Sequence, residues 1–566
     1  MKKIIVFALL ILVSIPLFSS QRMYDYKDNE YRLVRYILQS ENIAGPHDIT
    51  PISQQSLLSY LEKADKHGLS LDMEKVYENA VSMLNDNHAL VVGDDGSSLA
   101  IHLTVSPEMY IKLGDDAELH DMVKGYKDRL PFLELSLDFT FSDYVYGIFT
   151  LPFKMRLFDD SYYNSLFSQN IFKGGTAEPY QRVSPFKAYI SAGNSFMNFF
   201  LGRGKLNMGS GKTGNLFIAD NFQFQDFAKL SFFSDVFSYD YTLTSFDQEA
   251  ALSDSGVNSI KSGFSTFEPP YSSRVSHSFT FNIFDKVHIT VSEGAVLDTS
   301  NIFDIRMLNP FIFLHNWNGF GAEVDYWANN FASINLSASL GLGLRLDFQA
   351  VLDQFQLGNE AASGSQAFPN SFGFLLNLSS VSKGKNGFVE VYLEAVYTTP
   401  YLYLNNINKE GEKDTSFNAN RDLILGYYLT YGSDLSYTGY KWGPDTVAVS
   451  VGGNYLKYDG TLDLRFAATY RIHGESGIKY SENQNQSSVA EVGQEHVHEY
   501  ALTGILEHTL QLDLGATWQV HKSFSVSADT SYVLKMNHNN HEGDVWNNLQ
   551  FTISCSFDPL AFFEKK

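Results

Sequence analysis

Residues 99–557 contain many short segments in which apolar and polar residues alternate. In Leu462–Ile472, the even-numbered residues put leucine, phenylalanine, alanine, tyrosine and isoleucine on one face, while Asp463, Arg465 and Arg471 lie on the other. Alternation with a period of two predicts a strand whose faces meet different surroundings. Two architectures fit: a soluble sheet with a wet face, or an outer-membrane barrel whose apolar face meets lipid and whose polar face lines the lumen.

The alternating segments predict eighteen strands. A nineteenth candidate, 422–431, is placed in a loop, because a barrel whose two ends are both periplasmic needs an even number of strands. The predicted strands are 98–112, 130–142, 145–157, 185–193, 195–206, 227–234, 237–247, 275–284, 286–294, 333–341, 343–356, 371–382, 387–398, 445–456, 461–473, 499–519, 523–536 and 547–557.

The connections between these strands alternate between short turns and long loops. Short turns such as Tyr458-Asp459-Gly460 join strands two to three, four to five and so on, and long loops such as 295–332 and 399–444 join the others. Short turns at one end and long loops at the other are typical of outer-membrane barrels, and a soluble sandwich has no reason to sort its loops in this way. The sequence therefore predicts an all-β transmembrane β-barrel.

Residues 28–92 have helical spacing instead. Helices are expected at Glu30–Glu41, Pro51–His67 and Leu71–Asn85. Thr50 is the predicted N-cap of the second helix, with Pro51 at its first position. Because this small α-helical bundle precedes the first strand, we expect it on the periplasmic side.

The first twenty residues are typical of a secretory signal peptide, with Lys2 and Lys3 before an apolar run that ends at Ser19-Ser20. An uncleaved anchor helix is the alternative, but the run is short for a membrane span. The expected regions are residues 1–20 as signal peptide, 21–97 as N-terminal helical periplasmic region, 98–557 as outer-membrane β-barrel and 558–566 as C-terminal tail.

Composition narrows the function. Aromatic residues make up 15% of the chain, which suits girdles at two membrane interfaces. The net charge of −23 argues against non-specific nucleic-acid binding. The single cysteine, Cys555, cannot form an internal disulfide. We expect no cofactor, and the expected partners are outer-membrane lipid, the barrel-assembly machinery and surface or exported polysaccharide.

No nucleophile elbow or zinc-protease motif is present in the sequence, so we expect no enzyme activity. His496 and His498 alternate on one face, and the loop from Asn537 to Asp544 carries two further histidines. Two histidines without a third ligand at defined spacing are weak grounds for a metal site, and a polar loop is the simpler interpretation, so we expect no metal.

The alternation also assigns charged residues to the lumen. Charges of both signs in one enclosed space should pair, either as a salt-bridge network that stiffens the barrel or as the lining of a polar pore or sugar path. The lumen candidates are Glu134, Asp138, Arg345, Asp347, Asp353, Glu390, Glu394, Asp463, Arg465 and Arg471.

The two longest loops contain clusters of aromatic residues. Aromatic rings cover the C–H faces of sugars while their polar tips bond hydroxyl groups, but they serve equally well in an interface girdle. The glycan-binding candidates are Trp317, Tyr326, Trp327, Tyr401, Tyr403 and Trp442.

Several stretches, in the same order, resemble the outer-membrane capsule-assembly (Wzi-like) family. The helical start at Tyr31, the glycine-rich segments Leu201–Gly211 and Gly214–Phe222, and later Thr399–Tyr403 are similar to its motifs, although Asn207 and Ser210 replace the family's tryptophan and proline. The family-motif positions are Arg203, Gly204, Gly209, Gly211, Arg274, Glu293, Asn309 and Pro310.

The resemblance implies an eighteen-stranded barrel with a periplasmic helical bundle and a non-catalytic role in binding or organising surface polysaccharide. The alternative is a porin or substrate-specific uptake channel with cation preference, because acidic residues outnumber basic ones among the predicted lumen positions. The expected location is the outer membrane of a diderm bacterium, with the long loops at the cell surface.

Overall fold

The computed structural model describes residues 21–66, 68–69, 71–86, 91–93, 96–115, 130–142, 144–155, 180–182, 187–222, 224–247, 271–299, 309, 314, 327–355, 370–403, 424–429, 432–475 and 500–560. The predicted signal peptide lies outside these residues. No helix in the described part of the chain is long and apolar enough to cross a membrane.

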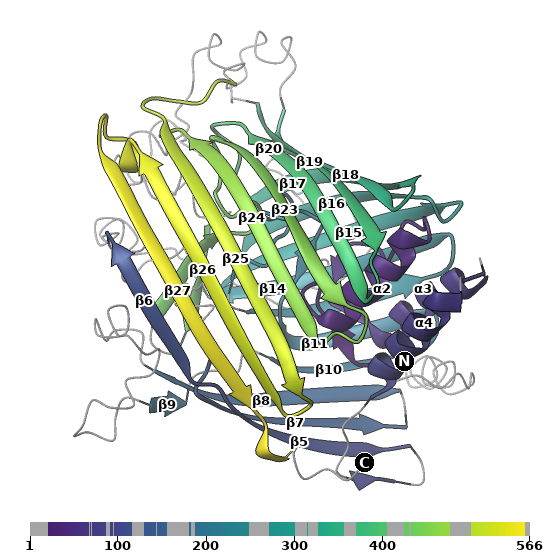
Figure 1. Ribbon diagram of the computed structural model, residues 1–566. Helices are drawn as coiled ribbons and strands as arrows, with labels where there is room; N and C mark the ends of the chain where they lie inside the picture. Colours follow the sequence, from purple (N-terminus) through teal and green to yellow (C-terminus); the bar gives the residue numbers. More distant parts are fainter. Residues whose placement is uncertain are drawn as a thin grey trace.

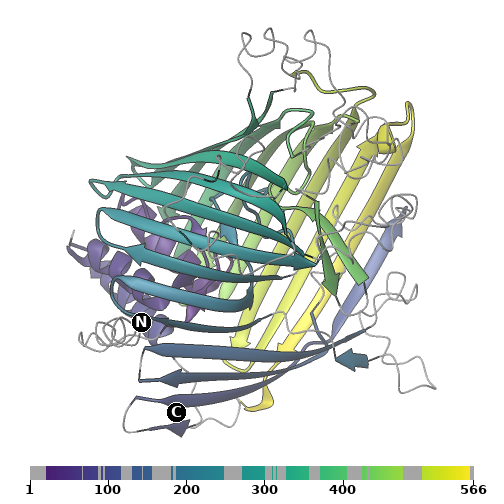
Figure 2. The same cartoon turned by 180° about the vertical axis from the view of Figure 1, so that it is seen from behind.

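The strands close into an antiparallel barrel, which confirms the predicted architecture (Figures 1 and 2). The connected sheet has 21 strand segments. These make eighteen barrel strands, because two strands are interrupted and the short β4 (Val91–Val92) only extends the edge of β5. The barrel strands are β5 (Ser98–Val105) with β6 (Glu108–Gly114), β7 (Leu133–Phe141), β8 (Val145–Met155), β9 (Tyr180–Arg182) with β10 (Ala188–Gly193), β11 (Met197–Gly204), β13 (Gln225–Phe233), β14 (Phe237–Asp247), β15 (Tyr271–Ile283), β16 (Val287–Thr299), β17 (Trp327–Gly341), β18 (Leu344–Gln354), β19 (Ser371–Lys383), β20 (Gly387–Thr398), β23 (Thr446–Lys457), β24 (Leu462–His473), β25 (Glu507–His521), β26 (Phe524–Met536) and β27 (Val545–Phe557).

The barrel closes where β27 pairs with β6, from Ser554 opposite Glu108 to Asn548 opposite Gly114. Pro107 interrupts the first strand because it has no N–H for the ladder, so β5 pairs with β7 and β6 pairs with β27. The predicted strand 499–519 begins later than expected, at Glu507. Its first residues leave the ladder because Gly504 has a positive φ and the Thr503 amide donates to Asp445.

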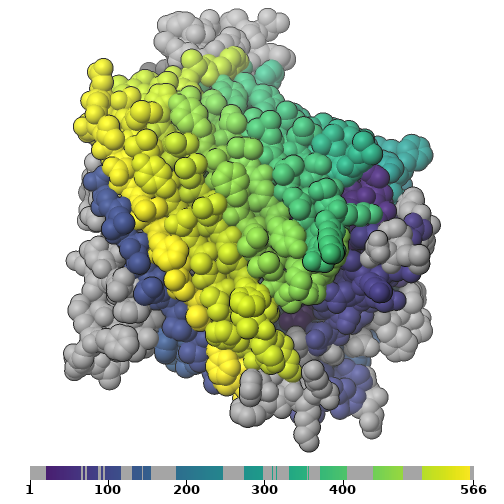
Figure 3. Space-filling view, viewed as in Figure 1, coloured from purple at the N-terminus to yellow at the C-terminus, as the bar shows by residue number. Residues whose placement is uncertain are grey.

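The predicted alternation is present in the strands. On β20, Val389, Val391 and Leu393 are exposed on the outside, while Glu390 and Glu394, in the opposite phase, are buried inside. The outer faces of β23–β27 form one continuous wall (Figure 3). Period-two phasing therefore identified both the lipid face and the lumen face.

The segment 422–431 is not a barrel strand, as predicted. Its described part forms β21 (Ile424–Leu429), which pairs only with β22 (Gly432–Tyr437) as a separate hairpin within the long loop. The loop after β11 also carries a short strand, β12 (Asn207–Met208), which pairs with β2 (Ile49–Thr50) of the N-terminal region. Two segments far apart in sequence therefore meet inside the barrel.

The N-terminal region contains three helices, α2 (Asn29–Ser40), α3 (Gln54–Lys66) and α4 (Leu71–Asn85), at the end of the barrel that carries the short turns (Figure 1). Helix α2 is buried on nearly all sides, with Leu33, Ile37 and Leu38 fully inaccessible to solvent. The helices share one apolar cluster with the barrel residues Val381, Phe388 and Leu456. The bundle is therefore part of the barrel's core and not a separate domain beside it.

The predicted start of the second helix is wrong. Residues 49–53 are extended, because β2 pairs with β12 and β3 (Ile52–Ser53) pairs with β1 (Met23–Tyr24). The helix therefore begins at Gln54, and the Ser53 hydroxyl accepts a hydrogen bond from the Ser56 amide at 3.3 Å. The favourable N-cap sequence at Thr50 does not start the helix, because long-range strand pairing keeps these residues extended.

Candidate functional site

Among the residues that the structure describes, two segments occupy the lumen: the N-terminal region 21–85 and the inward-folded loop 205–222. We call them together the plug. The largest apolar cluster joins plug residues such as Met23, Leu206 and Phe217 to wall residues such as Phe331 and Leu375. The plug is therefore anchored by apolar packing as well as by the polar contacts below.

Arg345 on β18 is the best-buried of the predicted lumen cations. Its guanidinium bonds the neighbouring Asp347 at 2.8 Å, the plug carboxylate of Asp48 at 2.6 Å and the Ala44 carbonyl at 2.5 Å. Three acceptors satisfy the forked geometry of a guanidinium. One wall residue thus holds the connection between α2 and β2.

Glu390 on β20 has the same role with opposite charge. It accepts from Lys212 of the loop at 2.6 Å, from Tyr36 of α2 at 2.9 Å and from Asn454 at 2.7 Å, and Arg35 lies 3.4 Å away. Both parts of the plug therefore meet on one buried carboxylate.

Asp463 on β24 binds the next arginine of α2. Its two oxygens accept from the two terminal nitrogens of Arg32 at 2.8 and 2.9 Å, and its neighbour Arg465 adds a contact at 2.7 Å. Arg465 also reaches Asp529 at 3.0 Å. This bidentate geometry is the strong form of an ion pair.

The loop is fastened mainly through its backbone. Glu394 accepts from the amides of Lys212 at 2.6 Å and Thr213 at 2.8 Å. Gln349 accepts from the Leu216 amide and donates to the Met208 carbonyl at 3.1 Å. These contacts fix the loop's course through the lumen.

The remaining lumen candidates have local roles. Asp353 accepts from the Tyr403 amide at 3.1 Å, Asp138 accepts from Tyr146 at 3.0 Å, and Arg471 bonds Glu507 at 3.2 Å. Glu134 is half-buried on β7. Among the described residues, four ion pairs join these positions to the plug, and the others join them to residues on their own or nearby strands.

The aromatic candidates separate into three groups. Tyr403 and Trp442 are buried in the apolar cluster that fills the lumen, so their rings are structural and offer no free face to a glycan, contrary to the prediction. Tyr401 is half-buried beside them. Trp317 and Tyr326 lie outside the described residues, and of Trp327 only the backbone, at the start of β17, is described.

Four of the eight family-motif positions lie in or next to the inward loop. Arg203 bonds Asp226 at 2.6 and 2.8 Å, and Gly204 ends β11 beside it. Gly209 and Gly211 lie where the loop passes Asn215 too closely for any side chain. Arg274 is fully buried and bonds Gln225 at 3.2 Å. The Glu293 carboxylate lies 3.0 Å from the His277 ring. Asn309 is exposed, and Pro310 lies outside the described residues.

Sequence reasoning missed the plug's own cations. Arg32, Arg35 and Lys212 are the partners of Asp463 and Glu390. A signal was present, because Arg35 lies on the apolar face of α2 with Tyr31 and Leu38, where an arginine needs a buried acceptor. The inward course of the loop had no comparable signal.

A polar cavity of about 410 Å³ remains between the plug and strands β20 and β23–β26. Its ionic lining has five cations, Lys27, Lys205, Lys212, Lys441 and Arg465, against three carboxylates, Asp220, Asp513 and Asp529. Lys27 lies 2.6 Å and Lys205 3.7 Å from the single carboxylate of Asp220. These two cations hold the pKa of Asp220 well below its ordinary value despite burial. The lining therefore carries two more positive than negative side chains, inside a protein of net charge −23.

Lys441 is the cavity cation with the fewest neutralising contacts. Its ammonium lies 4.3 Å from the centre of the Trp442 ring, and within the described ranges it forms no ion pair. A half-buried ammonium that faces a polar cavity is suited to bind an anionic group. No group of three or more potential metal ligands occurs in the described residues.

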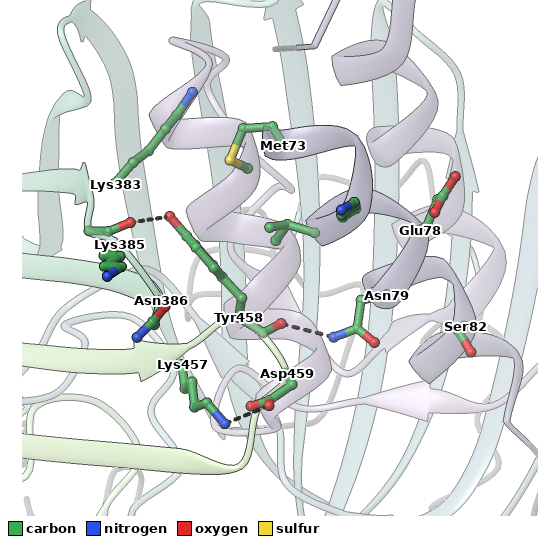
Figure 4. Close-up of a pocket in the computed structure, with 13 residues that line it drawn as sticks. Met73, Glu78, Asn79, Ser82, Lys383, Lys385, Asn386, Lys457, Tyr458 and Asp459 are labelled. Carbon is green, nitrogen blue, oxygen red and sulfur yellow. Dashed lines mark hydrogen bonds and ion pairs between the residues drawn. The ribbon is translucent and has the colours of Figure 1, made fainter. Parts of the chain in front are cut away.

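A second hollow, of about 1050 Å³, lies between α4 and the turns that follow β19 and β23 (Figure 4). Asn79 donates to the Tyr458 carbonyl at 3.0 Å, and the Tyr458 hydroxyl donates to the Gly384 carbonyl at 2.8 Å. These bonds connect α4 to both turns. The hollow is wide and open, and its residues fasten the helix to the rim.

Asp25 makes the plug sensitive to pH. Burial, with the nearby carboxylates of Asp28 and Asp220, raises the pKa of Asp25 to about 7 from an ordinary value of 3.8. Between these values the folded chain binds more protons than the unfolded chain, so the free energy of unfolding falls as pH rises. We expect Asp25→Asn to become more stable relative to wild type as pH increases from 4 to 8, measured by thermal unfolding. The exposed Asp459→Asn is the control, and a pH-independent difference between Asp25→Asn and wild type would contradict the assignment.

Together, the eighteen strands and the filled lumen define a transmembrane β-barrel of the outer-membrane class. No family model and no curated protein sequence matches the chain. Among solved structures, the chain is similar to Wzi of Escherichia coli, described as an outer-membrane protein involved in group 1 capsule assembly and a carbohydrate-binding β-barrel. The TM-score is 0.55 and the identity 14%, over 95% of this chain and 99% of that chain.

Two further solved structures, the outer membrane channel DcaP and OccD3, match at lower TM-scores. DcaP of Acinetobacter baumannii gives 0.36 with 11% identity over 83% of this chain and 99% of that one. OccD3 of Pseudomonas aeruginosa gives 0.37 with 11% identity over 83% and 93%. At these identities, the comparisons establish the fold alone.

Proposed function

We propose that this protein is a non-conducting, non-catalytic outer-membrane barrel of the capsule-assembly type, which binds or organises surface polysaccharide. The observation that carries the proposal is the plug, which is held to Glu390, Asp463 and Arg345 on three strands. A conducting pore gains nothing from buried ion pairs that bridge its lumen. The likeness to Wzi, a carbohydrate-binding barrel, supports the same function.

The glycan site that fits best is the cationic cavity beside Lys441. Its volume is within the range of small-ligand pockets, about 300–1,000 Å³, and its lining alternates lysines with Tyr26, Tyr392 and Asn454. Amide and hydroxyl groups suit sugar hydroxyls, and the surplus lysines suit a carboxylated sugar. The buried Tyr403 and Trp442 are no longer candidates, while Trp317, Tyr326, Trp327 and Tyr401 stay candidates for contacts at the loops.

A porin or uptake channel with cation preference is the second candidate. The predicted cation preference rested on the acidic residues of the lumen. Three of these, Asp347, Glu390 and Asp463, are each neutralised by an arginine or lysine. The lining of the remaining cavity holds more lysine and arginine than carboxylate side chains, which does not favour cations. The polar cavity is the one observation that favours a channel, so the channel function is tested as well.

Conductance in a planar bilayer separates the two functions. We expect no steady conductance from refolded protein whose folding is verified by its heat-modifiable mobility on gels. Steady, cation-selective conductance would overturn the closed-barrel proposal.

Polysaccharide binding is then measured with a carboxylated polymer, alginate, and a neutral one, dextran. We expect Lys441→Met to weaken alginate binding at least several-fold, with the exposed-turn variant Lys522→Met as the matched control. Equal binding by wild type and Lys441→Met would remove the cavity as the glycan site.

A further inference from the structure

The eight short turns at the helix-bearing end of the barrel differ in the side chains that they expose. The first five in chain order, from β7–β8 to β17–β18, each expose a large apolar side chain. These residues, which we call the apolar arc, are Tyr144 (37% exposed), Phe196 (40%), Val236 (68%), Phe284 (91%) and Leu342 (97%).

The last three turns form a charged arc. They expose Lys383 and Lys385 after β19, Asp459 after β23 and Lys522 after β25. Figure 4 shows the first two of these turns beside α4, where Lys457 pairs with Asp459 at 2.7 Å. Because the turns follow the strand order around the barrel, the exposed large apolar side chains of the turns lie on one side of the rim, where Asp235 and Lys286 are exposed as well. The turns on the other side expose charged residues without such an apolar side chain.

The apolar arc continues the lipid-facing surface of the same hairpins. On β15, the exposed Phe281 and Ile283 lead directly to Phe284 at the turn, and on β17 the exposed Leu340 leads to Leu342. The neighbouring β19 behaves differently: its outward apolar row stops at Leu378, and the exposed Ser382 and Lys383 follow. The lipid face therefore includes the turn tips after β15 and β17, but it ends at Leu378 on β19. On β25 it ends at the exposed Val520, before Lys522 at the turn.

Contacts with the helices do not account for the apolar arc. Beside Phe284, the Asp285 carboxylate accepts from Lys63 of α3 at 2.9 Å, and the Lys286 ammonium bonds the Asn42 carbonyl. The polar groups of this turn are thus used toward the plug, while the phenylalanine ring remains exposed. Large exposed apolar side chains, repeated on five neighbouring turns, are unfavourable in water.

We propose that lipid covers the apolar arc, so that the barrel lies asymmetrically in the membrane. The turns of β7–β18 are immersed in the interfacial layer, where aromatic and aliphatic side chains are favoured, and the charged arc emerges into water. The occupant is lipid because the arc is continuous with the lipid-facing wall. A second copy of the chain or another protein is the competing occupant.

Site-specific fluorescence tests the asymmetry. In full-length protein carrying Cys555→Ser, one cysteine is placed at Val236, Phe284 or Leu342, and in matched controls at Lys385, Asp459 or Lys522. Each is labelled with an environment-sensitive dye and reconstituted in vesicles of phosphatidylethanolamine and phosphatidylglycerol. Heat-modifiable mobility verifies that each variant is folded.

We expect nitroxide-labelled lipids to quench the apolar-arc dyes at least twofold more than the charged-arc dyes, and aqueous iodide to give the opposite order. Equal quenching at both arcs would overturn the proposal. Protection of the apolar-arc dyes from both quenchers would also overturn it and assign a protein occupant. A dependence of that protection on the protein-to-lipid ratio would identify the occupant as a second copy.

Discussion

Replacing Arg345 with alanine should lower the free energy of unfolding by about 3–5 kcal/mol, the range for breaking a buried ion pair from one side. The substitution leaves the buried Asp347 and the partly buried Asp48 without their shared cation, and it removes a bond to the Ala44 carbonyl. The plug and wall lose their joint on β18, so we expect the plug to detach before the strands separate. The measurement is equilibrium unfolding in detergent, followed by tryptophan fluorescence.

The matched control is Lys383→Ala, which removes a plug–wall ion pair at the rim. Lys383 pairs with Glu41 at 2.5 Å, but both side chains remain partly exposed to water. Exposed pairs contribute about 0–1 kcal/mol, so this variant should stay close to wild type. Comparable losses in the two variants would show that Arg345 contributes no more than an exposed pair. An unchanged Arg345→Ala would show that the remaining plug contacts, at Glu390 and Asp463 and in the apolar cluster, hold the plug without it.

The strands could be predicted because each carries its own evidence. The alternation of Val389, Glu390, Val391 and Leu393 reports two environments without reference to any other segment, and the even-number rule correctly removed 422–431 from the wall. Lumen positions follow from the same phase. Local patterns were therefore sufficient for the barrel.

The plug could not be predicted in the same way, because its contacts join distant segments. Arg32 meets Asp463 across 431 positions, and Thr50 pairs with Asn207, which overrides a good helix start. Tyr403 and Trp442 looked like surface aromatics, since burial within a long loop depends on where the loop folds. Hydrophobicity alone does not distinguish an aromatic ring that binds a sugar from one that packs in the lumen.

Gly211→Ala should loosen the inward loop and open the lumen. A Cβ at this position would lie 1.9 Å from the Gly214 carbonyl oxygen and 2.8 Å from a Leu375 methyl group. Because the first contact is with backbone, the side chains cannot relieve it by changing rotamer. Overpacking of this kind costs about 1–3 kcal/mol. That energy acts on a loop whose amides bind Glu394, so the Lys212 and Thr213 bonds should weaken with it.

Gly204→Ala is the control, because its nearest contact would be the Phe200 ring at 3.4 Å, an ordinary separation. Both glycines belong to the same motif region, so only the steric conflict distinguishes them. We expect planar-bilayer recordings to show transient conductance from Gly211→Ala and none from Gly204→Ala or wild type. Silent Gly211→Ala with a lowered unfolding midpoint would mean that residues 21–85 close the lumen without the loop. Unchanged stability in both variants would show that the loop can shift to accept a side chain at position 211. Its position in the lumen would then not depend on this glycine.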